Sequence, residues 1–140
     1  MGRMKMDAGF RALALAAALL APSPAVAEVP LDPGQAATVR LSPQRDLVYP
    51  APPPLTRPPA NHGAILGIDI DEPGRYHVAL GTRGWIELVR DGAPVPAVGH
   101  RHGEPGSGIA KIVDYDLLPG HYVIALSGMA DDEATITVAR

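Results

Sequence analysis

Apolar and polar residues alternate in short runs from residue 63 to the end of the chain. In the first run, Leu66, Ile68 and Ile70 alternate with Gly67 and Asp69. Because successive side chains of a strand point to opposite faces, each run predicts a β-strand with one buried face. Turn sequences rich in Gly and Pro separate the runs, which lie at residues 66–70, 76–80, 85–89, 109–115, 122–126 and 134–139.

No segment beyond residue 27 shows a helical period of apolar residues. Short strands punctuated by turns at this spacing are typical of antiparallel sheets that pack face to face. The chain has 140 residues, enough for one domain of this kind. The pattern therefore predicts an all-β domain over residues 63–140, an antiparallel β-sandwich or jelly roll of about seven to eight short strands.

One strand–turn–strand unit occurs twice. Residues 73–80 read PGRYHVAL, and residues 119–126, which begin 46 positions later, read PGHYVIAL. Each follows a segment in which Asp alternates with apolar residues. In both copies Pro fixes the turn, Gly permits a backbone conformation that other residues resist, and Tyr opens the inward-facing row of the next strand. The repeat predicts two similar hairpins that supply equivalent parts of two packed sheets.

A proline-rich segment, residues 28–62, precedes this domain and contains nine prolines. Such a segment cannot donate a regular ladder of hydrogen bonds, so it predicts an extended arm that is partly polyproline II. A short strand is expected within it at residues 37–41, where apolar and polar residues alternate. The arm is interpreted either as a ligand for an aromatic groove or, the favoured alternative, as a segment packed along the outside of the domain.

The first 27 residues carry the pattern of a cleaved signal peptide. Basic residues precede an apolar run of ten at residues 12–21, and Ala25-Val26-Ala27 fits the small-residue cleavage site. Glu28 would then begin the mature chain, which has nine basic and 14 acidic side chains and a net charge of −5. No second apolar segment is long enough to span a membrane. The sequence therefore predicts a periplasmic or secreted protein.

Composition excludes several classes of function. The chain has no Cys, which excludes a disulfide framework, a Cys-ligated zinc site, a cysteine nucleophile and a lipid-modified N-terminal Cys. The formal charge of the whole chain is −3, and its Lys and Arg residues are scattered rather than gathered in a basic stripe. This argues against a nucleic-acid partner.

The best candidate for a metal site is the pair His100 and His102. Residues two apart on a strand face the same way, so both imidazoles would reach one divalent ion such as Fe or Zn. Successive residues on one strand face are roughly 6.6 Å apart, so a third ligand is expected from a neighbouring element. The candidates are His121, Asp114 and Asp116. The alternative is two solvent-exposed histidines in a loop rich in Gly and Pro.

Two aromatic residues, Trp85 and Tyr115, would form a sugar-binding platform if both faced outward. Trp85 has the opposite parity to its apolar neighbours Ile86 and Leu88, which indicates exposure; the alternative is that it caps one end of the core. No catalytic residue is expected, because Ser107 lacks the glycine that a nucleophile elbow places two positions earlier. The alternation of acidic with apolar residues favours a solvated outer face of the sheet over a calcium site. The acidic residues concerned are Asp69, Asp71, Glu72, Asp114 and Asp116.

The repeated unit resembles the strand pairs of the bacterial pre-peptidase C-terminal domain, a small exported β-sandwich of jelly-roll type. In that domain a Pro-Gly turn and a following Tyr lead into the last strands. The resemblance covers residues 63–140 and implies the same fold. It also raises the idea of an accessory or inhibitory domain for an exported peptidase.

At closer range, four segments look like a group of small exported bacterial proteins without established function. That group usually has His-Gly-His where this chain has His100-Arg101-His102, and often a Cys where this chain has Ser107. The Ser at position 107 implies that any disulfide bond present in that group is missing here and is not required for the fold. Some members are labelled homogentisate dioxygenase, which implies iron. The segments are GRYHVALGTRGWIELVRDG (74–92), HRHG (100–103), GSGIAKIVDYDLLPGHY (106–122) and ALSG (125–128).

Two functions from different classes follow. The fold pattern, the export signal and the lack of a catalytic constellation favour a non-enzymatic exported β-sandwich that binds a protein or a cell-surface carbohydrate, with no cofactor. The alternative is a metal-binding protein or an iron-dependent dioxygenase that uses His100 and His102. The cupin spacing of such a dioxygenase is not reproduced, because Gly92 lies too far before His100 and Glu104 only two residues after His102.

Overall fold

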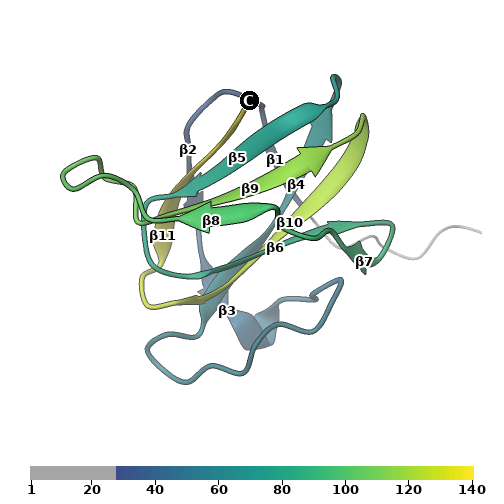
Figure 1. Ribbon diagram of the computed structural model, residues 1–140. Helices are drawn as coiled ribbons and strands as arrows, with labels where there is room; N and C mark the ends of the chain where they lie inside the picture. Colours follow the sequence, from purple (N-terminus) through teal and green to yellow (C-terminus); the bar gives the residue numbers. More distant parts are fainter. Residues whose placement is uncertain (1–27) are drawn as a thin grey trace, which may run out of the picture.

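Two β-sheets pack face to face in the computed structural model, which describes residues 28–140 (Figure 1). The predicted signal peptide lies outside the described residues. The elements are β1 (Val29–Leu31), β2 (Ala37–Arg40), β3 (Ser42–Pro43), a 3-10 helix η1 (Gln44–Asp46), β4 (His62–Ile70), β5 (Gly74–Leu80), β6 (Trp85–Arg90), β7 (Ala93–Pro94), β8 (Gly99–Arg101), β9 (Lys111–Leu117), β10 (Gly120–Met129) and β11 (Glu133–Ala139).

The strand order confirms the predicted all-β jelly roll. The first sheet has the order β1-β4-β10-β6-β7, with β3 also paired to β4, and the second has the order β2-β11-β5-β9-β8. Four antiparallel pairs nest within one another along the chain: β2 with β11, β4 with β10, β5 with β9, and β6 with β7. A ribbon of nested pairs rolled into two sheets is the jelly-roll arrangement. Of the strands that the structure describes, only β1 runs parallel to its neighbour, β4.

The core lies between the sheets and comes from the alternation seen in the sequence. On β5 the inward residues Tyr76, Val78 and Leu80 are buried, and the residues between them are partly exposed. The same alternation buries one face of β9, β10 and β11. Burial of apolar surface contributes roughly 25 cal/mol per Å², so this shared core is the main stabilising contribution. Its largest fully buried side chains include Leu66, Ile68, Leu80, Leu88, Ile124, Leu126, Met129 and Ile136.

The proline-rich segment belongs to both sheets rather than lying along the outside. The strand predicted at residues 37–41 is present as β2, which pairs with β11, and β1 extends the other sheet beside β4. Leu31 and Val39 from these strands are buried in the core. Farther along, the Tyr49 hydroxyl donates a hydrogen bond of 2.6 Å to the carbonyl of Leu126 on β10. The loop after η1 is therefore anchored to the sandwich, next to β3 in Figure 1.

The repeated units are real but are not hairpins. The units are β4–β5 and β9–β10, and the two strands of each lie in different sheets. Each strand pairs instead with a strand of the other unit, β4 with β10 and β5 with β9. The two tyrosines make equivalent hydrogen bonds. The Tyr76 hydroxyl donates to the carbonyl of Glu72 at 2.7 Å, and the Tyr122 hydroxyl donates to the carbonyl of Leu118 at 2.8 Å. Each hydroxyl therefore closes the turn that carries the chain from one sheet to the other.

Candidate functional site

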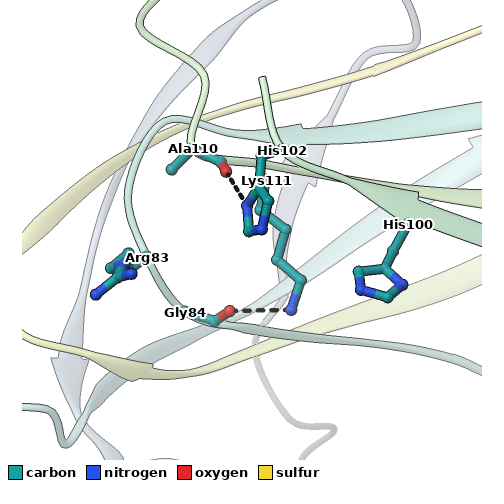
Figure 2. Close-up of a pocket in the computed structure, with 6 residues that line it drawn as sticks. All are labelled: Arg83, Gly84, His100, His102, Ala110 and Lys111. Carbon is teal, nitrogen blue, oxygen red and sulfur yellow. Dashed lines mark hydrogen bonds between the residues drawn. The ribbon is translucent and has the colours of Figure 1, made fainter. Parts of the chain in front are cut away.

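A pocket of about 470 Å³ opens where the edges of the two sheets meet (Figure 2). Three elements supply its lining: the turn before β6, the edge strand β8 with the residue after it, and the start of β9. The volume lies in the range of small-molecule sites. The lining residues are Arg83, Gly84, His100, His102, Ala110 and Lys111.

Strand β8 places His100 in the pocket. His100 pairs across the ladder with Val113 of β9, whose side chain is buried between the sheets. Cross-strand partners point to the same face, so His100 also faces the inner side, at the open edge of the sandwich. The next residue, Arg101, points to the outer face and forms an ion pair with Asp114. One edge strand thus supplies one imidazole to the pocket and one guanidinium to the outer face.

His102 follows β8 and is held by the loop that returns the chain to β9. Its Nδ1 donates a hydrogen bond of 3.4 Å to the carbonyl of Ala110. The two ends of that loop approach closely at Gly103, where a Cβ would stand 2.2 Å from the carbonyl oxygen of Ile109. A larger residue at position 103 would therefore separate the two ends of the loop. His100 and His102 both line this pocket.

Lys111 joins the two sheets at the pocket. It has the inward parity of Val113 but begins β9 at the sandwich edge, and its ammonium donates to the carbonyl of Gly84 at 3.3 Å. The same ammonium lies 4.9 Å from the centroid of the Trp85 ring, a cation–π contact. Trp85 opens β6 and is 49% exposed, as its parity predicts. Figure 2 shows Lys111 reaching across to Gly84.

The prediction that Tyr115 faces outward beside Trp85 is wrong. Tyr115 is 2% exposed and packs in the core, where burial raises the pKa of its hydroxyl to about 12 and Glu87 adds to the rise. The physical reason is the register of β9, in which Val113, Tyr115 and Leu117 all face inward. Trp85 is therefore the aromatic residue at this edge that solvent reaches.

His121 lies in the other sheet and does not approach His100 and His102. It sits on β10 between two carboxylates, with its Nδ1 2.7 Å from Asp69 and its Nε2 2.7 Å from Glu28. The hydrogen bond to Asp69, followed by that to Glu28, raises the pKa of His121 above its usual value. This histidine therefore ties the residue before β1 to the outer face of β4 and β10.

The acidic candidates for a third metal ligand are also engaged. Asp114 accepts from His77 at 2.6 Å and from Arg101, and these partners, His77 first, hold the pKa of Asp114 below its usual value. Asp116 accepts from Arg75 at 2.8 Å, which likewise lowers its pKa. Within residues 28–140 no three His, Asp or Glu side chains gather in a way that would hold a metal ion.

Sequence reasoning missed two of the pocket residues, Arg83 and Lys111. Lys111 lies in the inward row of β9, where a charged side chain is unusual, but the adjacent apolar residues Ile112 and Val113 left open which row faces inward, so it gave no clear signal. Arg83 lies in a turn and also gave none. The two residues are 28 positions apart, Arg83 before β6 of one sheet and Lys111 on β9 of the other. The packing of the two sheets, which local sequence does not encode, brings both to one pocket.

Comparison with known proteins gave no match: no family model matches the chain, and no curated protein or solved structure is significantly similar to it. Among residues 28–140, no helix is long and apolar enough to cross a membrane. The functional conclusion therefore rests on the chemistry of the pocket and of Trp85 beside it.

Proposed function

We propose that this chain is an exported, non-enzymatic β-sandwich protein of the periplasm or the extracellular space, and that it binds a cell-surface carbohydrate at the pocket beside Trp85. The observation that carries the proposal is the exposed indole of Trp85 next to a pocket with hydrogen-bond donors. The export half rests on the sequence pattern of residues 1–27. N-terminal sequencing of the exported protein should find Glu28 first.

The chemistry of the site suits a sugar. An aromatic ring offers an apolar face to the C–H groups of a sugar ring, and polar groups beside it fix orientation by hydrogen bonding to hydroxyls. Trp85 supplies the ring, and His100, His102 and Lys111 supply polar groups in the adjoining pocket. Trp85 is the single Trp of the chain, and half of its surface is exposed at the edge of the pocket instead of being buried in the core. A binding role explains this exposure.

Substitution of Trp85 tests the proposal. The exported wild-type protein, Trp85→Ala and Leu55→Ala are applied to an array of bacterial and host cell-surface glycans, and hits are confirmed by calorimetry. Leu55 is a fully exposed apolar residue outside the pocket lining and serves as the matched control. Binding that is lost in Trp85→Ala and kept in Leu55→Ala supports the proposal. Binding that survives Trp85→Ala, or no binding to any glycan, overturns it.

A metal-binding function, including an iron-dependent dioxygenase, is the second candidate. The observation in its favour is that His100 and His102 line one pocket. Two cationic side chains, Arg83 and Lys111, line the same pocket and would repel a divalent cation. Metal analysis of protein purified without an affinity tag decides the matter. Stoichiometric Fe or Zn that disappears when both histidines are changed to Ala would establish the metal function, and a trace content that does not change would discard it.

A further inference from the structure

From the charges that line the pocket, we infer that the ligand is an acidic saccharide, a sugar that carries a carboxylate as uronic acids do. The inference rests on the proposed function and names its substrate class. Three observations support it: the cations of the pocket have no acidic partner within 4.0 Å among residues 28–140, the lining offers more free donors than acceptors, and Lys111 places its charge beside the Trp85 ring.

Unpaired positive charge gathers at the pocket although the rest of the molecule is acidic. Residues 28–140 hold nine Lys and Arg side chains against 14 Asp and Glu. Five of the nine cations have an acidic partner within 4.0 Å: Arg45, Arg75, Arg90, Arg101 and Arg140. Arg83 and Lys111 are two of the four that have none within the described residues. Among the described residues, no carboxylate lies within 4.0 Å of either cation, although Asp131 lines a neighbouring pocket with Arg83.

The lining is rich in free donors. Lys111 donates one N–H to the Gly84 carbonyl and has two more, and the Arg83 guanidinium carries five N–H groups. The carbonyls of Gly84 and Ala110 already accept from Lys111 and His102. The free N–H groups of Lys111 and Arg83 thus outnumber the remaining acceptors, which are one ring nitrogen of each histidine and the second lone pair of each carbonyl. A carboxylate, which only accepts and takes up to about four hydrogen bonds, is the complementary group.

The Trp85 ring favours an acidic sugar over anions that have no apolar ring face. The Lys111 ammonium is 4.9 Å from the centroid of the ring, so a ligand that contacts the exposed part of the indole brings its substituents within reach of that charge. A uronic acid has an apolar ring face and a carboxylate attached to the same ring. A pocket of about 470 Å³ accommodates a small number of sugar units. Ring contact and charge together favour a uronic acid over a free inorganic anion.

Matched neutral and acidic ligands test the inference. Calorimetry compares trimers of galacturonic, mannuronic and glucuronic acid with their methyl esters, which keep the ring and lose the charge. At least one acid should bind tenfold or more tighter than its ester, and added salt should weaken that binding. Lys111→Gln and Arg83→Gln should each reduce the preference. Arg57→Gln is the matched control and should keep the preference, because Arg57 lies outside the lining and has no acidic partner within 4.0 Å in the described part of the chain.

The outcomes separate the inference from the function on which it rests. If an acid and its ester bind equally and Trp85→Ala abolishes both, the carbohydrate function stands and the acidic preference is wrong. If no saccharide binds, both are wrong. If a poly-glutamate peptide binds through Lys111 and Arg83 while no saccharide does, the pocket is selective for acidic protein segments, and the saccharide inference is overturned.

Discussion

Single hydroxyl groups close two of the turns that join the sheets. The Tyr122 hydroxyl donates to the carbonyl of Leu118 and accepts from the Leu118 N–H at 3.1 Å and from Arg90 Nη1 at 2.9 Å. The Tyr76 hydroxyl makes the corresponding bond to the carbonyl of Glu72. Both rings are buried in the core, and the hydrogen bonds of their hydroxyls are partly shielded from water. The repeat visible in the sequence thus has a definite physical role in each copy.

Removal of these hydroxyls should destabilise the protein unequally. Tyr122→Phe removes the partner of the Leu118 N–H and carbonyl and one of the hydrogen bonds of Arg90, which keeps its bond to the Pro119 carbonyl. The loss of these bonds should lower the free energy of unfolding by about 2 kcal/mol. Tyr76→Phe removes one bond and should lower it by about 1 kcal/mol. Urea denaturation at neutral pH measures both. Equal effects, or a larger effect for Tyr76→Phe, would contradict the roles assigned to the two hydroxyls.

The alternation of side chains along a strand predicted the exposed direction of Trp85 but not the buried direction of Tyr115. Trp85 lies next to Ile86 and two positions before Glu87, so its outward direction followed from one clear alternation. On β9 the apolar neighbours Ile112 and Val113 occupy opposite faces, and the sequence did not show which of them faces the core. The observed register buries Val113, which turns Tyr115 inward as well.

At the scale of elements, the arm is a structural part of the sandwich. Strands β1 and β2 join different sheets, so the chain between them connects the two layers at the start of the described residues. Short elements such as β3, β7 and β8 have two or three residues, too few for alternation to be visible in the sequence. Their pairing depends on neighbouring strands, and for this reason the sequence did not predict the edge that holds the pocket.

Substitution of two valines in the arm tests whether the arm shares the core of the sandwich. Val39 on β2 is 4% exposed, whereas Val48 in the following loop is 65% exposed. Val39→Ala should lower the free energy of unfolding by about 2 kcal/mol, because it removes buried methyl groups and leaves a cavity. Val48→Ala should change it by no more than about 0.5 kcal/mol. Chemical denaturation compares the two, and similar small effects would show that β2 does not share the core.

His121 should make the attachment of the arm depend on pH. Its pKa is raised in the folded state by Asp69 and Glu28, so its stabilising contribution is complete below the unfolded pKa of about 6.5 and is lost as the pH rises through the higher folded value. The difference in unfolding free energy between wild type and His121→Gln should therefore be larger near pH 6 than near pH 9.

Urea denaturation at both pH values measures this difference. The matched control is His100→Gln, since His100 has no acidic partner within the described residues. A difference for His121→Gln that stays constant from pH 6 to pH 9, or that grows with pH, would mean that the protonated imidazole does not hold the Glu28 segment in place.

At the scale of the whole molecule, charge is distributed unevenly around an acidic jelly roll. On the outer face of β5, β8 and β9, arginines and His77 pair with aspartates, whereas at the pocket two cations face open space without an acidic partner among the described residues. A local positive site on a net negative protein attracts acidic ligands to one place and repels them elsewhere. The fold class was predictable because alternation is local. The pocket was not, because it forms between residues far apart in sequence.

Chemical-shift mapping by NMR shows at the level of single residues whether the pocket beside Trp85 holds an acidic saccharide. The uniformly labelled exported protein is titrated with whichever uronic acid trimer binds by calorimetry, and with its methyl ester. The acid should shift the amide signals of Gly84, His102 and Lys111 and the indole N–H signal of Trp85, and the ester should shift them far less. Shifts confined to other surfaces, or no saturable shift with any trimer, would contradict the account.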